Sequence, residues 1–180
     1  MHWSDIEHAQ PRLARLGRQR LFEPGVVLVA SIRQDGTARL SPVEPLLMDG
    51  DLWLSMMWQS GKARDLLRDP RILVHGIVTS RDGAAGEFKA RGTARTEEDQ
   101  DVQRRYADTV TARLGWNPQP GKFHLFAVDI DQVTYIAYDP ADPGDQHVAM
   151  WPPAREFIRR ATSPTSVGEP EPVSDLITSG

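Results

Sequence analysis

The chain of 180 residues contains no cysteine. This absence excludes disulfide bonds, thiolate metal ligands and a cysteine nucleophile, and it fits a reducing cytoplasmic location. Long hydrophobic runs are also missing, so the sequence predicts neither an apolar signal segment nor a membrane span of roughly 20 apolar residues. Basic residues are not in excess: the net charge of −4 argues against a nucleic-acid-binding surface, although local basic groups could hold a single phosphate.

Several catalytic and cofactor motifs are absent as well. No Gly-x-Gly-x-x-Gly follows a strand-like run, and helices and strands do not alternate regularly, so a Rossmann unit is not expected. No Gly-x-Ser-x-Gly elbow is present, which argues against a serine hydrolase. The five histidines are scattered without metal-ligand spacing. His75 and His124 fall within strand patterns, and we expect hydrogen-bonded structural roles for both.

The length suits one domain with short appendages. We divide the chain into an N-terminal helical segment (1–22), the domain itself (23–161) and a C-terminal tail (162–180). In the first segment a helix is expected from Pro11 to about Arg20, because a proline inside a longer helix would cost about 3 kcal/mol. The tail is rich in Ser, Pro, Gly, Glu and Thr, and we expect it to be poorly ordered or wrapped around a partner.

Short strand-like runs joined by turn residues dominate the domain. The segment 34–37 and the pair Asp49-Gly50 indicate tight hairpin turns, whereas Pro42 and Pro45 fit the edge or a bulge of a sheet. Strands are expected at residues 26–32, 38–48, 52–57, 72–79, 87–95, 123–138 and 146–151, and helices at 96–114 and 154–161. This pattern predicts a mainly β protein, an antiparallel barrel of six to seven strands with peripheral helices.

A polar loop between two of these elements has the parts of a phosphate site. Ser60 can cap the following helix, Gly61 lets the backbone approach an anion, and Lys62 adds a positive charge beside helix N-terminal amides. An ordinary helix start with a solvated lysine is the alternative, because short motifs often match by chance.

This loop is part of an ordered series of motifs: the strand Arg39-Leu40-Ser41-Pro42-Val43, the Asp49-Gly50 turn, the loop-helix from Ser60 and the run Asp69-Pro70-Arg71. Their order resembles that of the pyridoxamine 5'-phosphate oxidase-like FMN-binding split-barrel family. In that family a strand ends in a small polar turn, a hairpin follows, and a Ser-x-Lys-x-x-x-Leu loop-helix leads through Asp-Pro-Arg into a hydrophobic strand. The matching residues are Arg39-Leu40-Ser41-Pro42-Val43, Asp49-Gly50, Leu52-Trp53-Leu54-Ser55, Ser60-Gly61-Lys62-Ala63-Arg64-Asp65-Leu66, Asp69-Pro70-Arg71 and Ile72-Leu73-Val74. The similarity is good over residues 26–94, loose to residue 138 and absent from the tail.

The resemblance implies a split β-barrel that binds FMN across the interface of a homodimer. Lys62, with Ser60 and Arg64, would hold the phosphate beside Gly61. Two strands would contact the rest of the cofactor. The backbone of the first would run beside the isoalloxazine ring, and the side chains of the second would line the ring and the ribityl chain. The residues concerned are Arg39, Leu40, Ser41 and Pro42 on the first strand, and Ser55, Met56 and Met57 on the second.

Some of these residues could equally serve the surface or the core of the domain. Arg64 can pair with acidic neighbours along its helix, and methionines in a strand more often belong to a core. Glu87 stands where the family often has a glutamine, so it is left out of the site. True pyridoxamine 5'-phosphate oxidases end in an Arg-x-His segment that reads the substrate, and residues 148–153 of this chain lack it. Vitamin B6 oxidation is therefore not expected.

The function that the resemblance implies is hydride transfer between FMN and a small-molecule substrate. The cofactor carries the chemistry, so no catalytic residue of the protein is required. A reductase that uses the deazaflavin coenzyme F-420 is an alternative, in which Lys89, Arg91 or Lys122 could meet a longer polar tail. Charges that protect strand edges would account for these three residues equally well. A non-enzymatic cofactor-binding or haem-binding module is the third possibility.

Overall fold

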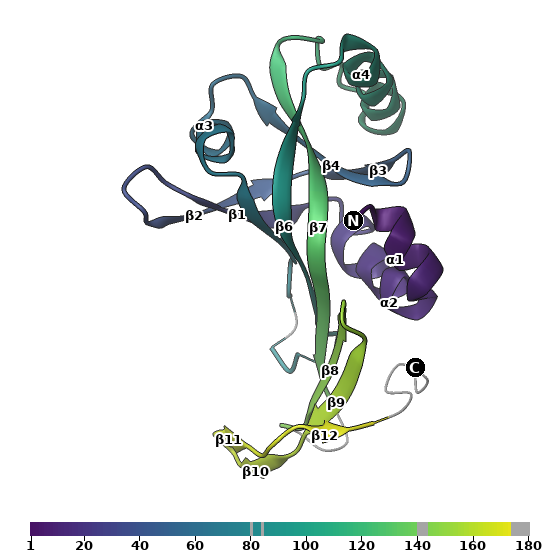
Figure 1. Ribbon diagram of the computed structural model, residues 1–180, viewed down its shortest axis with the longest axis vertical. Helices are drawn as coiled ribbons and strands as arrows, with labels where there is room; N and C mark the ends of the chain where they lie inside the picture. Colours follow the sequence, from purple (N-terminus) through teal and green to yellow (C-terminus); the bar gives the residue numbers. More distant parts are fainter. Residues whose placement is uncertain (80, 84, 140–143, 174–180) are drawn as a thin grey trace.

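The computed structural model describes residues 1–79, 81–83, 85–139 and 144–173. An antiparallel barrel forms its centre, with helices outside it and a strand-rich arm extending from one end (Figure 1). The strands of the barrel are β1 (Val27–Ile32), β2 (Ala38–Val43), β3 (Pro45–Met48), β4 (Asp51–Met57), β5 (Arg71–Gly76), β6 (Glu87–Glu97) and β7 (Phe123–Tyr138). The mainly β class and the antiparallel barrel that the sequence predicted are confirmed.

The barrel closes because one segment of chain contributes to both of its edges. β1 pairs with β2 and β5, β5 with β6, β6 with β7, and β7 with β4, all in antiparallel fashion. β4 also pairs with β3, which continues from β2 after a break at Glu44. The sequence predicted a single strand over residues 38–48. It is interrupted because Pro42 and Pro45 flank Glu44, and neither can donate a hydrogen bond to a neighbouring strand.

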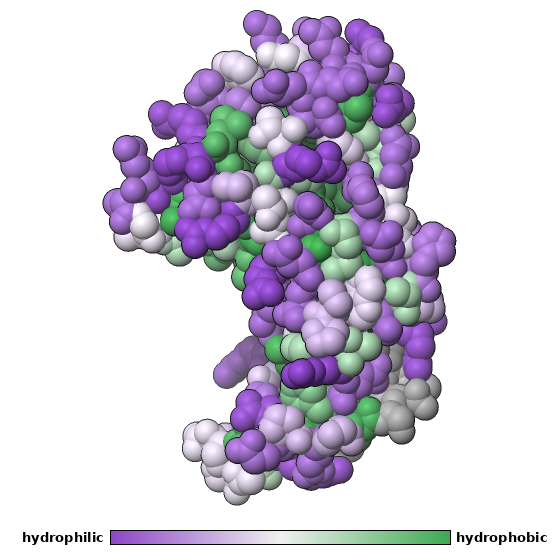
Figure 2. Space-filling model, in the orientation of Figure 1, coloured by the Kyte–Doolittle hydropathy of each residue, from purple (hydrophilic) through white to green (hydrophobic). Residues whose placement is uncertain are grey.

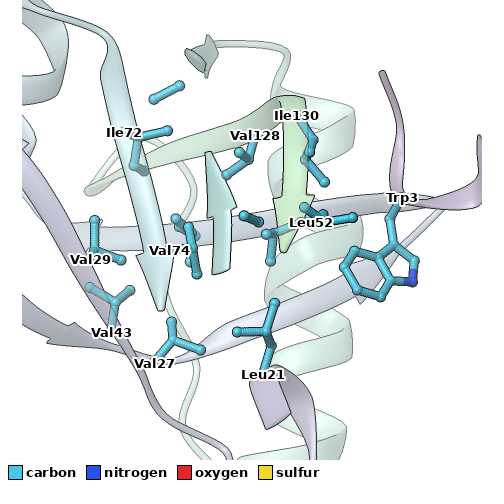
Figure 3. Close-up of a cluster of buried hydrophobic side chains, with 14 of the residues drawn as sticks. Trp3, Leu21, Val27, Val29, Val43, Leu52, Ile72, Val74, Val128 and Ile130 are labelled. Atoms are coloured by element: carbon cyan, nitrogen blue, oxygen red, sulfur yellow. The ribbon is translucent and has the colours of Figure 1, made fainter. Parts of the chain in front are cut away.

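Inward-facing side chains of these strands form the core (Figure 3). In β1 buried and half-buried residues alternate, with Val27, Val29 and Ser31 facing inward. Leu28 and Ala30 therefore face outward, because successive side chains of a strand point to opposite faces. The predicted Asp49-Gly50 turn is confirmed: both residues have positive φ angles, 53° and 81°, as a two-residue hairpin requires.

Three N-terminal helices cover one side of the barrel: α1 (Trp3–Ala9), α2 (Pro11–Gly17) and the π-helix η1 (Arg18–Phe22) (Figure 1). The sequence predicted a helix only from Pro11. α1 precedes it because Pro11 takes the first turn of a separate helix, where its missing N–H is not needed. Trp3 and Leu21 enter the core (Figure 3). Helix α2 can pack closely on Trp3 because residue 17 is glycine: a Cβ at this position would lie 2.4 Å from the ring of Trp3.

Helix α4 (Gln100–Leu114) covers a different part of the barrel (Figure 1). Its residues Tyr106 and Val110 belong to a second hydrophobic cluster with β3, β4 and β7. The sequence placed the start of this helix at Thr96, but β6 continues to Glu97. Asp99 caps α4 instead, accepting hydrogen bonds from the backbone N–H groups of its first turn. The helix ends at Leu114, as predicted, and Gly115 with φ 75° is its C-cap.

The arm consists of the second half of β7 and the strands that follow it (Figure 1). β7 pairs with β8 (Gln146–Trp151), β8 with β9 (Arg155–Arg159), and β9 with the short β12 (Glu171–Pro172), while β10 (Ala161–Ser163) pairs with β11 (Ser166–Val167). The helix predicted over residues 154–161 is wrong, because pairing across the sheet, Phe157 opposite Val148, overrides local helix propensity.

The described part of the predicted tail, residues 162–173, takes part in these short strands, and most of its residues are exposed. Leu176 and Ile177, two tail residues that could pack on the domain, lie outside the described residues. Whether the tail wraps around a partner stays a prediction.

Candidate functional site

The predicted phosphate loop connects β4 to helix α3 (Gly61–Arg68). Ser60 is the N-cap of α3, and its Oγ accepts a hydrogen bond from the N–H of Ala63 at 3.4 Å, so the predicted capping role is confirmed. Gln59, just before the cap, has a positive φ of 55°, which is uncommon for a residue other than glycine. The sharp turn that results carries the chain from the end of β4 into the first turn of α3.

On one side of this turn lies a cavity of about 550 Å³, named here the main cavity. Its walls come from the β2–β3 junction, the end of β4, the first turn of α3 and the loop after α4. The lining residues are Val26, Pro42, Val43, Glu44, Ser55, Met56, Met57, Trp58, Lys62, Trp116, Pro118, Gln119, Lys122 and Phe123. The wall is mostly apolar, with a few polar and charged groups, as is typical of small-molecule sites.

Lys62 reaches the main cavity from α3. Its Nζ donates a hydrogen bond to the backbone carbonyl oxygen of Pro42 at 3.0 Å. Burial lowers the pKa of Lys62 below its ordinary value. No carboxylate lies within ion-pair distance of its ammonium group in the part of the chain that the structure describes. The lysine is thus held in place by a neutral acceptor, and the carboxylate of Glu44, which lines the same cavity, forms no ion pair with it.

The end of β4 supplies the predicted residues Ser55, Met56 and Met57 to the same wall. Met56 is also part of the hydrophobic core, whereas Met57 is 80% exposed. Ser55 Oγ lies 2.9 Å from the hydroxyl of Tyr106 on α4. The alternation of a strand thus divides the two methionines between core and surface, and it directs Ser55 toward α4 and the cavity.

His124 supports the turn before α3. Its Nε2 accepts a hydrogen bond from the backbone N–H of Gln59 at 3.2 Å, and its ring stacks on Trp58 with centroids 4.4 Å apart and an angle of 5° between planes. His124 is 8% exposed, and burial lowers its pKa. The neutral ring is therefore favoured, and only the neutral ring can accept the bond from Gln59.

A second hollow, of about 490 Å³, lies against the other side of the first turn of α3 and is named here the arginine groove. Its lining residues are Arg33, Gln34, Asp35, Arg39, Gly61, Arg64, Asp65 and Arg68. Arg39 Nε donates to Asp65 Oδ2 at 2.5 Å, and Ser31 and Arg68 also contact this carboxylate. Burial alone would raise the pKa of Asp65, but the hydrogen bond and charge of Arg39, with Ser31 and Arg68, outweigh it and lower that pKa.

The predicted site residues therefore do not form one cluster. Five line the main cavity: Pro42, Ser55, Met56, Met57 and Lys62. Three line the arginine groove: Arg39, Gly61 and Arg64. Three line neither: Leu40, Ser41 and Ser60. Gly61 lies against the guanidinium of Arg39, since a Cβ there would be 3.2 Å from its central carbon.

Sequence reasoning missed several residues of the main cavity. Trp58 stands next to the predicted loop and could have been included on that ground. Trp116 and Gln119 come from the loop after α4, and no motif connects this loop to Lys62. Lys122 of the same loop was named only as a possible contact for the tail of coenzyme F-420, and it lines the main cavity. Tyr106 looked like any aromatic residue of an amphipathic helix, so nothing in the sequence signalled its contact with Ser55.

The structural roles predicted for two histidines are confirmed. His75 has Nδ1 2.5 Å from the carbonyl oxygen of Gly76 and Nε2 3.1 Å from Glu87, and His124 accepts from Gln59. Within the described residues no three His, Asp or Glu side chains are grouped so that they could hold a metal ion. The same residues contain no helix with the length and apolar character of a membrane span.

A closed antiparallel barrel with a cavity of this size defines a barrel protein with room for a small-molecule ligand. The family model described as pyridoxamine 5'-phosphate oxidase matches residues 17–137. The chain therefore belongs to the pyridoxamine 5'-phosphate oxidase-like family, as its sequence resemblance indicated, and its barrel is a split barrel. No match is found among curated proteins.

Solved structures share this fold. A NimC/NimA family protein from Clostridium acetobutylicum superposes with a TM-score of 0.59 at 12% identity, over 84% of this chain and 95% of its own. An F420 reductase gives 0.51 at 16% identity, over 64% of this chain and 94% of its own. A haem-binding protein from Mycobacterium smegmatis gives 0.54 at 20% identity, over 74% of this chain and 57% of its own. Identities this low show a common fold and not a common activity.

Proposed function

We propose that the protein is a flavin-dependent oxidoreductase that binds FMN in the main cavity and exchanges hydride with a small-molecule substrate. One observation carries this proposal: Lys62, which forms no ion pair among the residues described, faces a largely apolar cavity. An apolar wall with one cation suits a molecule that has a flat aromatic ring at one end and a phosphate at the other. A cytoplasmic location is part of the same proposal.

The cavity residues fit this cofactor. A volume of about 550 Å³ falls within the range of roughly 300–1,000 Å³ that is usual for ligand sites. Trp58, Trp116 and Phe123 offer aromatic surface to a ring, and Lys62 and Lys122 offer charge to a phosphate. The bound flavin would supply the hydride chemistry. The protein would bind and orient the cofactor and exclude water, so it needs no acid or base of its own.

The direct test is to purify the protein and identify what it binds. An oxidised flavin absorbs at about 450 nm and a deazaflavin at about 420 nm, so a spectrum of the preparation separates the two chromophores. We expect binding of FMN in preference to riboflavin, and reduction and reoxidation of the bound cofactor. A protein that stays colourless after incubation with both cofactors would contradict the proposal and favour a non-enzymatic role.

The deazaflavin coenzyme F-420 is the second candidate. Lys122 favours it, because this residue adds a second cation to the main cavity that could meet a longer anionic tail. Replacement of Lys122 by alanine should weaken F-420 binding more than FMN binding if the tail lies there. Equal effects on both cofactors would remove this reason for preferring F-420.

A homodimer is also proposed, on the evidence of an outer apolar patch. Leu28, Ala30, Leu40, Pro42 and Leu73 share the outer face of β1, β2 and β5, because they stand opposite one another in the strand pairing. Leu40 is 63% exposed. Hydrophobic residues are also visible on the face drawn in Figure 2, where the outline is hollowed between barrel and arm. A second copy could cover the patch through a two-fold interface and shield the main cavity from water.

Sedimentation of two variants tests the dimer. Leu40→Glu places a charge in the patch and should give a monomer with weaker cofactor binding. Leu114→Glu changes a comparably exposed leucine, 56% against 63%, outside the patch, and should leave the dimer intact. A wild-type monomer that binds cofactor tightly would overturn the dimer while leaving the proposed activity in place.

A further inference from the structure

Helix α4 reaches the wall of the main cavity through a buried hydrogen bond. The hydroxyl of Tyr106 lies 2.9 Å from Oγ of Ser55, a residue that lines the cavity. Tyr106 is 1% exposed, and its ring packs on Phe123 with centroids 5.8 Å apart. Packing thus fixes the position of the ring of Tyr106 and holds its hydroxyl beside Ser55.

The direction of this bond follows from the surroundings of Tyr106. Burial raises the pKa of Tyr106, the bond to Ser55 lowers it in part, and the charge of Glu44 raises it further, so the phenol keeps its proton near neutral pH. In the described part of the chain its hydroxyl contacts no other hydrogen-bond acceptor. A buried hydroxyl that donates nothing is costly. Tyr106 is therefore the donor, and Ser55 Oγ is the acceptor.

We propose that Tyr106 is a positioning residue for the main cavity, which makes the Ser55 hydroxyl a hydrogen-bond donor toward the bound ligand. A serine hydroxyl can accept two hydrogen bonds and donate one. When Tyr106 occupies an acceptor position, the proton of Ser55 stays available on the cavity side. Ser55 then selects a ligand atom that accepts, such as a carbonyl oxygen or an unprotonated ring nitrogen.

This inference rests on the proposed function, because it takes the ligand to be a flavin or deazaflavin. A donor beside the ring favours the more negatively charged, reduced form over the oxidised form. Loss of the donor should therefore weaken binding and also lower the reduction potential of the bound cofactor. A purely structural role for Tyr106 would change the stability of the protein without changing that potential.

Tyr106→Phe removes the phenolic oxygen and keeps the ring. We expect the Kd for FMN to rise about 3- to 10-fold, the value for one neutral hydrogen bond, with a lower potential of the bound flavin. Ser55→Ala should give the same two changes, and adding it to Tyr106→Phe should add little. Ser55→Thr keeps the hydroxyl and should bind nearly as wild type. Tyr135→Phe is the matched control, a half-buried tyrosine outside the main cavity.

The outcomes separate this inference from the proposed function. If wild type binds neither FMN nor F-420, both are overturned. If wild type binds and Tyr106→Phe leaves affinity and potential unchanged, the positioning role alone is overturned. Should Tyr106→Phe fail to fold, Ser55→Ala and Ser55→Thr, which leave Tyr106 in place, still test the hydroxyl that it positions: equal affinity and potential in these two variants would overturn the role. Additive losses in the double variant would also overturn the role, because they would mean that Tyr106 and Ser55 act independently.

Discussion

The first turn of α3 separates two hollows that use their cations differently. In the arginine groove, Arg39 and Arg68 converge on Asp65, a carboxylate that is 4% exposed. In the main cavity, Lys62 contacts only the carbonyl oxygen of Pro42 among described side-chain and backbone acceptors. The groove has more arginines, but an internal carboxylate balances part of their charge. The number of cations therefore does not locate an anion site; a cation without a carboxylate partner does so better.

The largest effect on stability is expected from Asp65→Ala. Removing this carboxylate leaves Arg39 unpaired, which we expect to lower the free energy of unfolding by about 2–3 kcal/mol, somewhat below the value for a fully buried pair because Arg39 is 30% exposed. Urea unfolding measures the change. FMN binding in the main cavity should change little, because Asp65 belongs to the other hollow.

Asp69→Ala is the control for Asp65→Ala. Asp69 pairs with Arg71 at 2.6 Å, but that arginine is 72% exposed, so the loss should be much smaller than for Asp65→Ala. Equal losses in the two variants would show that the ion pairs of the groove are no more important than those of the surface. The claim that Asp65 balances the arginines of the groove in a way that stabilises the fold would then be wrong.

Lys62→Ala tests the other side of the comparison. A charge-assisted hydrogen bond contributes about 1.5–3 kcal/mol, so the Kd for FMN should rise roughly 10- to 100-fold. Stability without cofactor should hardly change. Titration with FMN and riboflavin identifies the phosphate as the cause: wild type should prefer FMN, and the variant should lose most of that preference.

Arg64→Ala is the matched control on the same helix. Arg64 lines the arginine groove, so its loss should leave FMN affinity within about threefold of wild type, less than one charge-assisted bond is worth. If Arg64→Ala weakens binding as strongly as Lys62→Ala, the phosphate lies nearer the groove than the main cavity. If Lys62→Ala binds FMN as tightly as wild type, the phosphate assignment is wrong.

The sequence predicted those elements whose signals are local. The Asp49-Gly50 turn, the Ser60 cap and the end of α4 at Gly115 depend on residues within a few positions, and the structure confirms all three. The strand β9 was predicted as a helix because its stability comes from pairing with β8, which no local signal reveals.

The same limit applies to the candidate site. Adjacent residues of one loop were predicted to act together, but successive positions at the start of α3 face different hollows: Lys62 the main cavity, and Gly61 and Arg64 the arginine groove. A helix advances about 100° per residue, so sequence neighbours diverge in space. Tertiary packing alone brings Trp116 to the main cavity and Tyr106 to Ser55, and a single sequence does not show that.

A smaller effect is expected from pH at the turn that separates the two hollows. His124 must be neutral to accept from Gln59, and burial lowers its pKa in the folded state. The unfolded chain, with a histidine pKa of about 6.5, binds the proton more readily. Stability is therefore fully present above pH 6.5 and falls as the pH drops below it, by at most about 1.4 kcal/mol per pH unit for one group.

Comparison with His124→Gln isolates this contribution. Glutamine can still accept from the N–H of Gln59 but does not titrate. Urea unfolding between pH 7.5 and about 5.5 should show a shallower decline for the variant than for wild type. Parallel declines would assign the pH dependence to other groups and leave His124 as a packing residue.

The smallest effect is expected far from both hollows, in the tail. Residues 162–173 are mostly exposed, and β12 adds only the pairs Glu171–Ile158 and Pro172–Phe157 to the arm. So little buried area hardly offsets the ordering of the chain. Deletion of residues 162–180 should shift the melting temperature by about 2 °C or less, which corresponds to well under 1 kcal/mol.

Val173, which lies near Leu13 and Ala149, is the tail residue that could pack on the domain and so contradict this prediction. A large drop in melting temperature, reproduced by Val173→Ala in the full chain, would show that the tail packs on the domain and contributes to its stability.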